Sequence, residues 1–314
     1  MRIVIVGAGA LGGFYGGLMA RAGEEVSFLA RGKTAEALRT RGLTVRSKLA
    51  GDFTIPVTVL DDPAGAEPPD LIFFAVKAYD LEDAAERIRP LVGPETLVLS
   101  VQNGVDAEER LARIIGPDGI VSGAVYVSAT VEEPGVIAQV GGPGLVQFGP
   151  YAGVPMSRLA ELKALFDRIG VANELHEDMR RPLWEKFMAI CAMSGVSALT
   201  RLTLRQIFDC PESRALYRDV MAEVTAVARA RGVDLPESAA DRMMENLERM
   251  PALPERGSLA YDLMAGRRLE LETLNGTVVR LGRESGVDTP CNRVIYAALK
   301  PYVDGSPDAR DMAP

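Results

Sequence analysis

The sequence is poor in the residues that most often bind metals or cross-link a chain. It has one histidine, His176, and three cysteines, Cys191, Cys210 and Cys291. The cysteines are odd in number and lack the spacing of a zinc site, which argues against structural zinc and favours a reducing compartment. We therefore expect a cytoplasmic protein without a metal centre.

An excess of positive charge and a long apolar run are also missing. Lys and Arg total 35 against 43 for Asp and Glu, so the formal net charge is −8. Such a chain is a poor candidate for nonspecific binding to nucleic acid or to an anionic membrane. No run approaches the ~20 apolar residues of a membrane span, and the apolar start is too short and too broken by glycine for a signal peptide. We expect neither nucleic acid nor a membrane as partner, and the 314 residues predict two domains.

A glycine-rich motif lies between a predicted strand and a predicted helix near the start of the chain. The apolar run 3–6 leads into Gly7-x-Gly9-x-x-Gly12, and a helical stretch over 14–22 and a second strand over 25–30 follow. This is the order of a dinucleotide-binding βαβ unit, whose helix N-terminus faces the phosphates with free N–H groups. The alternative is a glycine-rich turn without a ligand. The residues predicted to line the dinucleotide are Gly7, Ala8, Gly9, Ala10, Leu11 and Gly12.

The residue after the second strand indicates which dinucleotide binds. NAD sites usually place Asp or Glu there, bonded to the ribose 2′-hydroxyl. This chain places Arg31 there, with Lys33 two residues on. A guanidinium can clamp a 2′-phosphate that a carboxylate would repel. We therefore predict NADP(H), and the alternative is a solvated arginine in a loop.

Strand and helix signals alternate through the first half of the chain. Asp106 and Glu109 have the spacing of an N-cap pair that opens a helix. The alternation predicts an α/β fold with a Rossmann-type, doubly wound sheet over residues 1–177. The predicted strands are 54–60, 70–76, 96–101, 121–130 and 136–148, and the predicted helices are 81–91, 107–115 and 157–169.

The pattern changes to helical runs in the second half. Runs over 182–193, 213–231 and 269–284 have helical spacing, and no strand signal separates them. We predict an all-α C-terminal domain over 178–303. The remaining residues, 304–314, are rich in proline, glycine and aspartate and are predicted to form a flexible tail.

Two side chains are candidates for moving a proton. His176 lies among acidic residues in the predicted linker, where a histidine is more often a surface residue than a catalyst. Lys186 lies in the apolar segment 183–191, with Ile190 and Ser194 at four-residue steps on the same face. A lysine shifts its pKa readily when it is buried, which suits proton transfer. The alternative is a lysine whose stem only covers apolar surface.

Several motifs taken together resemble the ketopantoate reductase family, and the resemblance extends from Met1 to about Tyr302. It implies an N-terminal Rossmann-type domain, a C-terminal helical domain, and the NADPH-dependent reduction of 2-dehydropantoate to D-pantoate in pantothenate synthesis. The motifs are Gly7-x-Gly9-x-x-Gly12, Arg31, Ala75-Val76-Lys77, Gln102-Asn103-Gly104, Trp184-Glu185-Lys186 and the segment from Glu270 to Asn275-Gly276.

The resemblance also implies roles for single residues. Lys186 matches a catalytic lysine that donates a proton to the ketone oxygen, and Glu270 matches a glutamate beside the nicotinamide and the substrate. Asn103 matches an asparagine that contacts both the nicotinamide ribose and the substrate. Lys77 matches a lysine on the adenosine side of the cofactor.

Two further positions are assigned by the same resemblance. Ser258 matches a serine that binds the substrate carboxylate, and Ala129 matches an alanine that contacts the cofactor. Simpler interpretations stay open: Asn103 in a turn, Glu270 on a solvated helix face, and Ser258 as a helix N-cap.

The sequence departs from the family pattern around the expected substrate. Ile190 and Ser194 stand where asparagines are usual, and Asp80 stands where a glutamine is common. Ile190 cannot donate a hydrogen bond, so selection for the 4-hydroxyl of pantoate should be weaker.

The sequence thus predicts an NADPH-dependent 2-keto acid reductase that acts on a small-molecule substrate, with 2-dehydropantoate as the first candidate. One alternative is a related D-2-hydroxyacid dehydrogenase with a more apolar substrate. Another is a non-catalytic NADP-binding sensor. A homodimer is left open.

Overall fold

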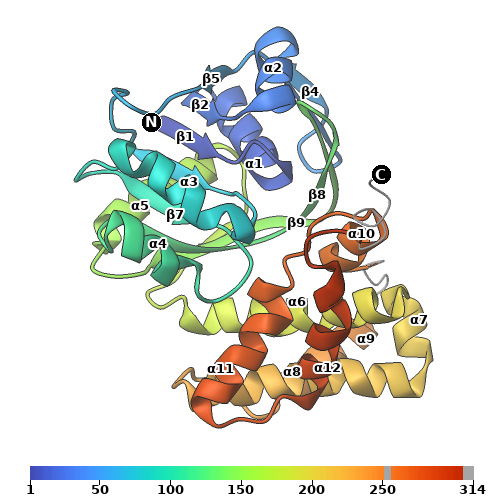
Figure 1. Cartoon of the computed structure of the whole chain (residues 1–314). Helices are drawn as coiled ribbons and strands as arrows, with labels where there is room; N and C mark the ends of the chain where they lie inside the picture. Colours follow the sequence, from blue (N-terminus) through green and yellow to red (C-terminus); the bar gives the residue numbers. More distant parts are fainter. Residues whose placement is uncertain (251–255, 307–314) are drawn as a thin grey trace. The chain divides into compact units, whose positions relative to one another are not determined.

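The computed structural model describes residues 1–250 and 256–306, which form two compact units. Unit 1 contains Met1–Gln102 and Asp106–Met179, and unit 2 contains Asn103–Val105 with the chain from Arg180 onward. Unit 1 runs from blue to green in Figure 1, and the helices of unit 2 run from yellow to red. Within the described ranges, no helix has both the length and the apolar character needed to cross a membrane. Of the tail predicted over 304–314, residues 307–314 lie outside the described residues.

Unit 1 is built on a single sheet. Its strand order is β4-β3-β9-β8-β7-β6-β1-β2-β5, with β10 paired to β9. Every adjacent pair in the series β8-β7-β6-β1-β2-β5 is parallel. After β1 the chain first forms β2 on one side of β1 and later forms β6 on the other side of β1. This reversal beside β1 is the doubly wound arrangement, so the predicted fold class is confirmed. The strands are β1 (Arg2–Val6), β2 (Glu25–Leu29), β3 (Leu43–Ser47), β4 (Phe53–Ile55), β5 (Thr58–Leu60), β6 (Leu71–Phe74), β7 (Leu97–Ser100), β8 (Ile120–Glu133), β9 (Val136–Pro150) and β10 (Asn173–Leu175).

Each face of the parallel sheet has its own apolar core. On β1, Ile3 and Ile5 join the core beneath α1 (Ala10–Arg21), α2 (Gly32–Arg41) and α5 (Met156–Arg168). Val4 and Val6 join the opposite core beneath α3 (Leu81–Ile88) and α4 (Ala107–Ile115). Because successive residues of a strand face opposite sides, a strand covered on both faces must be continuously apolar, as β1 is.

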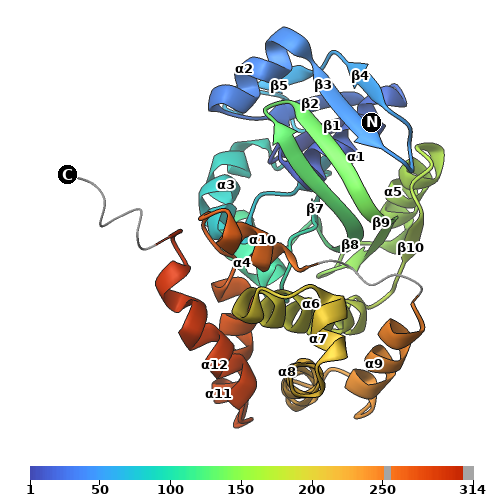
Figure 2. The same cartoon turned by 90° about the vertical axis from the view of Figure 1, so that its right-hand side faces the viewer.

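Helix α1 is enclosed by the sheet on more than one side. It contacts β1 and β2, and also β3, β8 and β9, which Figure 2 shows side by side with α1 behind them. A Cβ on Gly13 would lie 2.6 Å from Ile137 of β9, and one on Gly17 would lie 3.0 Å from Val45 of β3. The glycines of α1 beyond the dinucleotide motif therefore allow strands to pack directly on the helix backbone.

Two local predictions in unit 1 need correction. The single run predicted over 54–60 is two strands: β4 pairs antiparallel with β3, whereas β5 pairs parallel with β2 at the far end of the sheet. Pro56, which has no N–H for a ladder, lies between them. Helix α4 begins after Asp106 as predicted, but the Asp106 side chain makes no capping hydrogen bond and lies 3.9 Å from Arg110 instead.

Unit 2 is helical, as predicted, and contains no strand among its described residues. Its long helix α6 contacts α8, α10 and α12. The core around α6 includes Trp184 and Phe187, with Val220 and Val224 from α8. The helices are α6 (Arg180–Thr200), α7 (Leu204–Asp209), α8 (Pro211–Ala230), α9 (Ala239–Arg249), α10 (Ser258–Met264), α11 (Thr277–Ser285) and α12 (Pro290–Leu299).

The continuous helix predicted over 269–284 is wrong in its first half. Regular helix α11 begins only at Thr277, and it is preceded by a π-helical segment, Glu272–Gly276, in which Leu274 has non-helical angles of φ −95° and ψ −105°. The π-helical segment has only 5 residues, too few for the apolar spacing to reveal the change from an α-helix. Asn275, in this segment, donates side-chain hydrogen bonds to α6 and α12.

Candidate functional site

The predicted cofactor residues of unit 1 meet at one edge of the parallel sheet. Val6 of β1 pairs with Leu29 of β2 and with Phe74 of β6, so the loops that follow these three strands start side by side. These loops carry the glycine motif, Arg31 and Lys77, respectively. Ligands of open α/β sheets bind outside the carboxyl ends of the strands where the strand order reverses, which is the position of this edge.

The glycine-rich loop has the shape of a phosphate cradle. Gly7 has φ +98°, and a Cβ there would lie 2.8 Å from the Val76 nitrogen. A Cβ on Gly12 would lie 2.0 Å from the Gly7 carbonyl oxygen, so helix and strand approach closely. At Gly9, the N-cap of α1, a Cβ would meet nothing within 4 Å, so the space before the helix is open. No side chain caps α1 and its first turn has no acidic residue, so the loop fits a dinucleotide phosphate.

Arg31 lies at the N-cap of α2 and is exposed, and no carboxylate among the described residues forms an ion pair with it. Lys77, also exposed, precedes the short 3-10 turn Ala78–Asp80 after β6. Asp80 is half-buried at the N-cap of α3. The free guanidinium of Arg31 leaves its hydrogen-bond donors available to an anion.

Two other predicted positions of unit 1 do not belong to these three loops. Ala129 is half-buried on β8, beyond Ser122, the last β8 residue that pairs with β7, and the β8–β9 register shifts beside it. His176 follows β10, and its Nε2 lies 3.3 Å from a carboxylate oxygen of Glu174. The histidine thus sits beside an acidic surface residue in unit 1 and has no place in the cradle.

In unit 2, α6 carries Lys186, Ile190 and Ser194 in one row, as predicted. The Lys186 side chain is buried, with 9% of the residue exposed. Ile190 is half-buried and packs against the apolar core of the unit. Ser194 is completely buried, and its hydroxyl has no hydrogen-bond partner among the described residues.

Ser194 is covered by the start of α10. A Cβ on Gly257 would lie 2.4 Å from the Ser194 Cα, and the Gly257 amide donates to the Ser197 hydroxyl at 3.1 Å. Ser258, the first residue of α10, is exposed, and Gly257 rather than Ser258 is the N-cap. The backbone of Gly257 therefore covers Ser194, whereas Ile190 stays partly exposed, and a substrate pocket lined by both residues remains a prediction.

Glu270 and Asn103 belong to the same unit as Lys186. Glu270 is buried, with 7% of the residue exposed, just before the π-helical segment. Asn103 is half-buried in the turn after β7, and the turn residues Asn103–Val105 group with unit 2 although β7 and α4 belong to unit 1. Unit 2 therefore holds a buried lysine, a buried glutamate, an amide and an exposed serine, which are the kinds of group that can donate a proton or bind a carboxylate.

Sequence reasoning missed Gly257 and Asn275. Gly257 has a sequence signal only as the neighbour of Ser258, and its contact with Ser194 depends on the packing of two helices. Asn275 belongs to the motif from Glu270 to Gly276, but the resemblance gave it no role of its own. Among the described residues, no group of three or more His, Cys, Asp and Glu side chains could hold a metal ion.

Comparisons with known proteins agree along the whole chain. Residues 3–153 match the family described as "Ketopantoate reductase PanE/ApbA", and residues 178–303 match its C-terminal part. A 2-dehydropantoate 2-reductase of Halobacterium salinarum is 31% identical over 302 residues, which cover 94% of this chain and 96% of that protein. A ketopantoate reductase structure from Ralstonia eutropha superposes with a TM-score of 0.87 at 35% identity, covering 96% of this chain and 98% of that one.

One structural neighbour has a different name. D-mandelate dehydrogenase, solved with NADH and anilino(oxo)acetate, superposes with a TM-score of 0.90 and full coverage of both chains, at 19% identity. At that identity the likeness concerns the fold alone.

Proposed function

This chain belongs to the ketopantoate reductase PanE/ApbA family, and we propose that it reduces the keto group of a 2-keto acid with NADPH, taking 2-dehydropantoate as substrate and giving D-pantoate. The observation that carries the proposal is Lys186, a lysine buried on an apolar helix in the same unit as the buried Glu270. Burial of a charged group costs free energy, and such groups are concentrated at functional sites. A protein that only sensed NADP would have no use for this pair.

We propose NADPH rather than NADH because of Arg31. Its guanidinium is exposed at the edge of the sheet beside the glycine cradle and forms no ion pair with a described carboxylate. The 2′-phosphate that distinguishes NADPH is the anion it would bind, with Lys77 on the same adenosine side. Residues 1–177 would hold the cofactor, through Gly7 to Gly12 and the contacts of Ala129, and residues 178–303 would supply the groups that act on the substrate.

NADPH, when bound, supplies the hydride that adds to the carbonyl carbon. Lys186, as an ammonium, stabilises the charge that grows on the carbonyl oxygen and then donates its proton to that oxygen. Asn103 and Ser258 would hold the substrate, the hydroxyl of Ser258 at its carboxylate. Glu270 would keep the lysine in place and balance its charge.

A second candidate function differs from the first in the side chain of the substrate. Ile190 presents an alkyl group on the row that starts at Lys186, and it packs on the apolar core of unit 2. An alkyl group favours a 2-keto acid with an unsubstituted aliphatic chain, so the second candidate is a D-2-hydroxyacid dehydrogenase that acts on such acids. Ser194 is covered by Gly257, so with either substrate it would act only indirectly, through the position of Gly257.

The deciding experiment is a substrate panel. NADPH oxidation is followed at 340 nm with 2-dehydropantoate, 2-ketoisovalerate, pyruvate and phenylglyoxylate, and NADH is tested in parallel. A kcat/KM highest for 2-dehydropantoate supports the first candidate, and one highest for an unsubstituted aliphatic acid supports the second. Tight NADPH binding without turnover of any keto acid would leave the sensor interpretation.

We also propose a cytoplasmic location, since the three cysteines are all free.

A further inference from the structure

Asn275 lies in the family motif over residues 270–276, and the resemblance assigned it no role. The residue is completely buried within the π-helical segment Glu272–Gly276. Its side-chain nitrogen donates to the Cys191 carbonyl oxygen of α6 at 3.3 Å and to Oδ1 of Asn292 on α12 at 2.9 Å. One amide therefore joins the segment to two different helices.

The side-chain amide of Asn275 packs against α6 at Gly195, where there is no room for a Cβ beside it. A Cβ on Gly195 would lie 2.8 Å from both Nδ2 and Oδ1 of Asn275. Both acceptors of Nδ2 are carbonyl oxygens, so the amide orientation follows from the hydrogen bonds and leaves Oδ1 without a partner in the part of the chain that the structure describes. A buried acceptor without a partner is costly, so its presence indicates that the location of this side chain matters.

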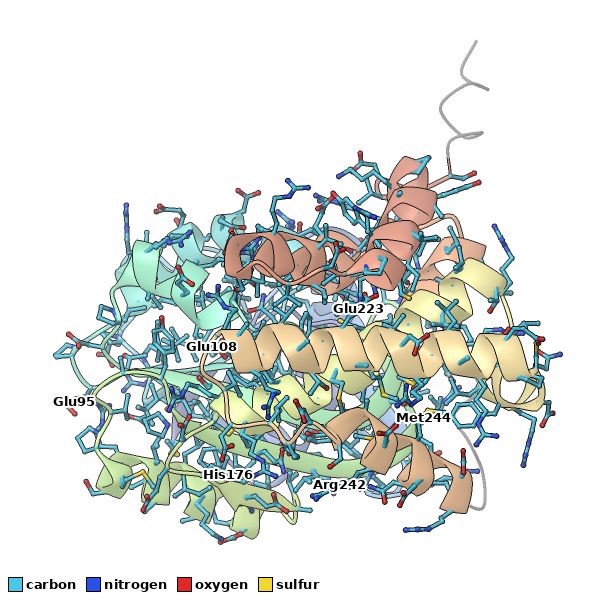
Figure 3. All side chains as sticks on the ribbon, turned by 90° about the horizontal axis from the view of Figure 1, so that it is seen from below. Glu95, Glu108, His176, Glu223, Arg242 and Met244 are labelled. Atoms are coloured by element: carbon cyan, nitrogen blue, oxygen red, sulfur yellow. The ribbon has the colours of Figure 1, made fainter. Side chains whose placement is uncertain are left out.

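The network continues to a carboxylate on α8. Asn292 donates from its side-chain nitrogen to Glu223 at 2.7 Å, and Glu223 also accepts the backbone N–H groups of Cys291 and Asn292 at 2.7 and 3.0 Å. Figure 3 labels Glu223 on the side of α8 that faces the C-terminal helices. Glu223 thus caps α12 from another helix and fixes the amide of Asn292 toward Asn275.

The backbone between Glu270 and Asn275 is irregular. Two of its backbone hydrogen bonds differ in span: the Leu274 amide donates to the Glu270 carbonyl oxygen at 3.2 Å, and the Gly276 amide donates to the Leu271 carbonyl oxygen at 2.9 Å. Leu274 is outside helical geometry, so the regular helical pattern is interrupted within the segment. Cys191, where Asn275 is attached, follows Lys186 on the same rigid helix.

We propose that Asn275 is a positioning residue, which holds the segment carrying Glu270 against α6 and thereby sets the place of Glu270 relative to Lys186. Its catalytic part rests on the function proposed above. Its structural part, that Asn275 orders residues 270–276, is independent of that function.

The structural part is tested by hydrogen–deuterium exchange on the full chain without cofactor. Asn275→Ala should raise exchange of the amides of residues 270–276 by at least about tenfold, because the anchored segment opens locally. Thr225→Val is the matched control: Thr225 is also a buried polar residue of unit 2, with a hydroxyl that donates to the Met221 carbonyl oxygen at 2.9 Å. Unchanged exchange over 270–276 in Asn275→Ala overturns the proposal.

A second variant covers the case in which Asn275→Ala does not fold. Gly195→Ala removes no hydrogen-bonding group and places a more favourable residue in the helix, yet its methyl group displaces the Asn275 amide. We expect the same selective rise in exchange. A variant that folds and exchanges like the wild type contradicts the anchoring role.

The catalytic part is tested by a double-mutant cycle in kcat for the keto acid. We expect Asn275→Ala to lower kcat about tenfold in the wild type and less than about twofold in the Glu270→Gln background, because both changes disturb one group. Its kcat–pH profile should shift in the same direction as that of Glu270→Gln. Additive losses, or an unshifted profile, overturn positioning. If the wild type turns over no keto acid, the proposed function fails, and the catalytic part fails with it, whereas the exchange result still decides the anchoring.

Discussion

The backbone of Gly257 rests directly on Ser194: a Cβ at residue 257 would approach the Ser194 Cα to 2.4 Å. The clash is with a main-chain atom, which no rotamer change can relieve. Helix α10 is therefore docked on α6 with no space between the two backbones. The position of Ser258, the next residue, depends on this contact.

Gly257→Ala should displace the start of α10 and with it the Ser258 hydroxyl. We expect kcat/KM for the keto acid to fall roughly 10- to 100-fold, as for a displacement of about 1 Å in a catalytic site. The Kd for NADPH, whose proposed binding residues lie in the Rossmann-type domain, should change less than about twofold. Steady-state kinetics and fluorescence titration give the two quantities. Met264→Ala, at the exposed end of α10, is the control and should be neutral. A wild-type kcat/KM in Gly257→Ala would show that Ser258 does not hold the substrate.

Arg31→Ala tests cofactor choice. Loss of a charged hydrogen-bond donor to the 2′-phosphate should weaken NADPH binding roughly 10- to 100-fold and leave NADH binding nearly unchanged. Calorimetric titration of both cofactors measures this, with Arg21→Ala as a matched arginine, since Arg21 donates to the Ala50 carbonyl oxygen on another part of unit 1. If the wild type binds NADH as tightly as NADPH, the role assigned to Arg31 is wrong.

Lys186→Ala tests the proton donor. We expect kcat to fall by roughly 10²- to 10⁴-fold, the usual contribution of a general acid, while the Kd for NADPH stays similar. Lys163→Ala removes a surface lysine paired with Asp167 at 2.8 Å and serves as the control. A kcat within a few-fold of the wild type in Lys186→Ala would remove the lysine from the mechanism.

Ile190→Asn tests substrate selection. An amide at this position restores a donor for a substrate hydroxyl, so kcat/KM for 2-dehydropantoate relative to 2-ketoisovalerate should rise by about tenfold or more. Ile190→Val keeps the position apolar and should leave the ratio unchanged. A wild-type preference for 2-dehydropantoate of several thousandfold would mean that the hydroxyl is recognised elsewhere, and that Ile190 only packs against the core of unit 2.

Glu82 and Arg110 give a pH-dependent contribution to stability. Two hydrogen bonds from Arg110, at 2.7 and 2.9 Å, lower the pKa of Glu82 from its ordinary value of 4.5. A carboxyl whose pKa is lower in the folded state stabilises the fold above its unfolded pKa and loses that effect as the pH falls through the folded value. Because the pair is partly exposed, Glu82→Gln should lower the free energy of unfolding by about 0.2–1 kcal/mol at pH 7.

Urea unfolding at pH 7, 5 and 4 measures this difference, which should shrink between pH 5 and pH 4. Glu36→Gln, on α2, is the control, since Glu36 has no ion-pair partner among the described residues. A Glu82→Gln difference that is the same at all three pH values would exclude the linkage.

Much of unit 1 could be predicted because its signals are local. The apolar strand β1, the glycine motif and Arg31 lie within the first 31 residues, and the carboxyl ends of parallel strands must share an edge of the sheet. Likewise, one continuous helix sets Lys186, Ile190 and Ser194 in a row, since a four-residue step returns to the same helix face.

Only the tertiary structure decided the rest, because the remaining features depend on residues far apart in the chain. The run 54–60 divides between two ends of a sheet because β3 and β2 offer separate edges. Gly257 covers Ser194 from a distant part of the chain, and the side chain of Asn275, beside the irregular Leu274, bonds to α6 and α12. The sequence by itself determined the layered fold and the chemistry available to each unit, whereas packing between distant segments determined which of those groups are covered and which stay exposed.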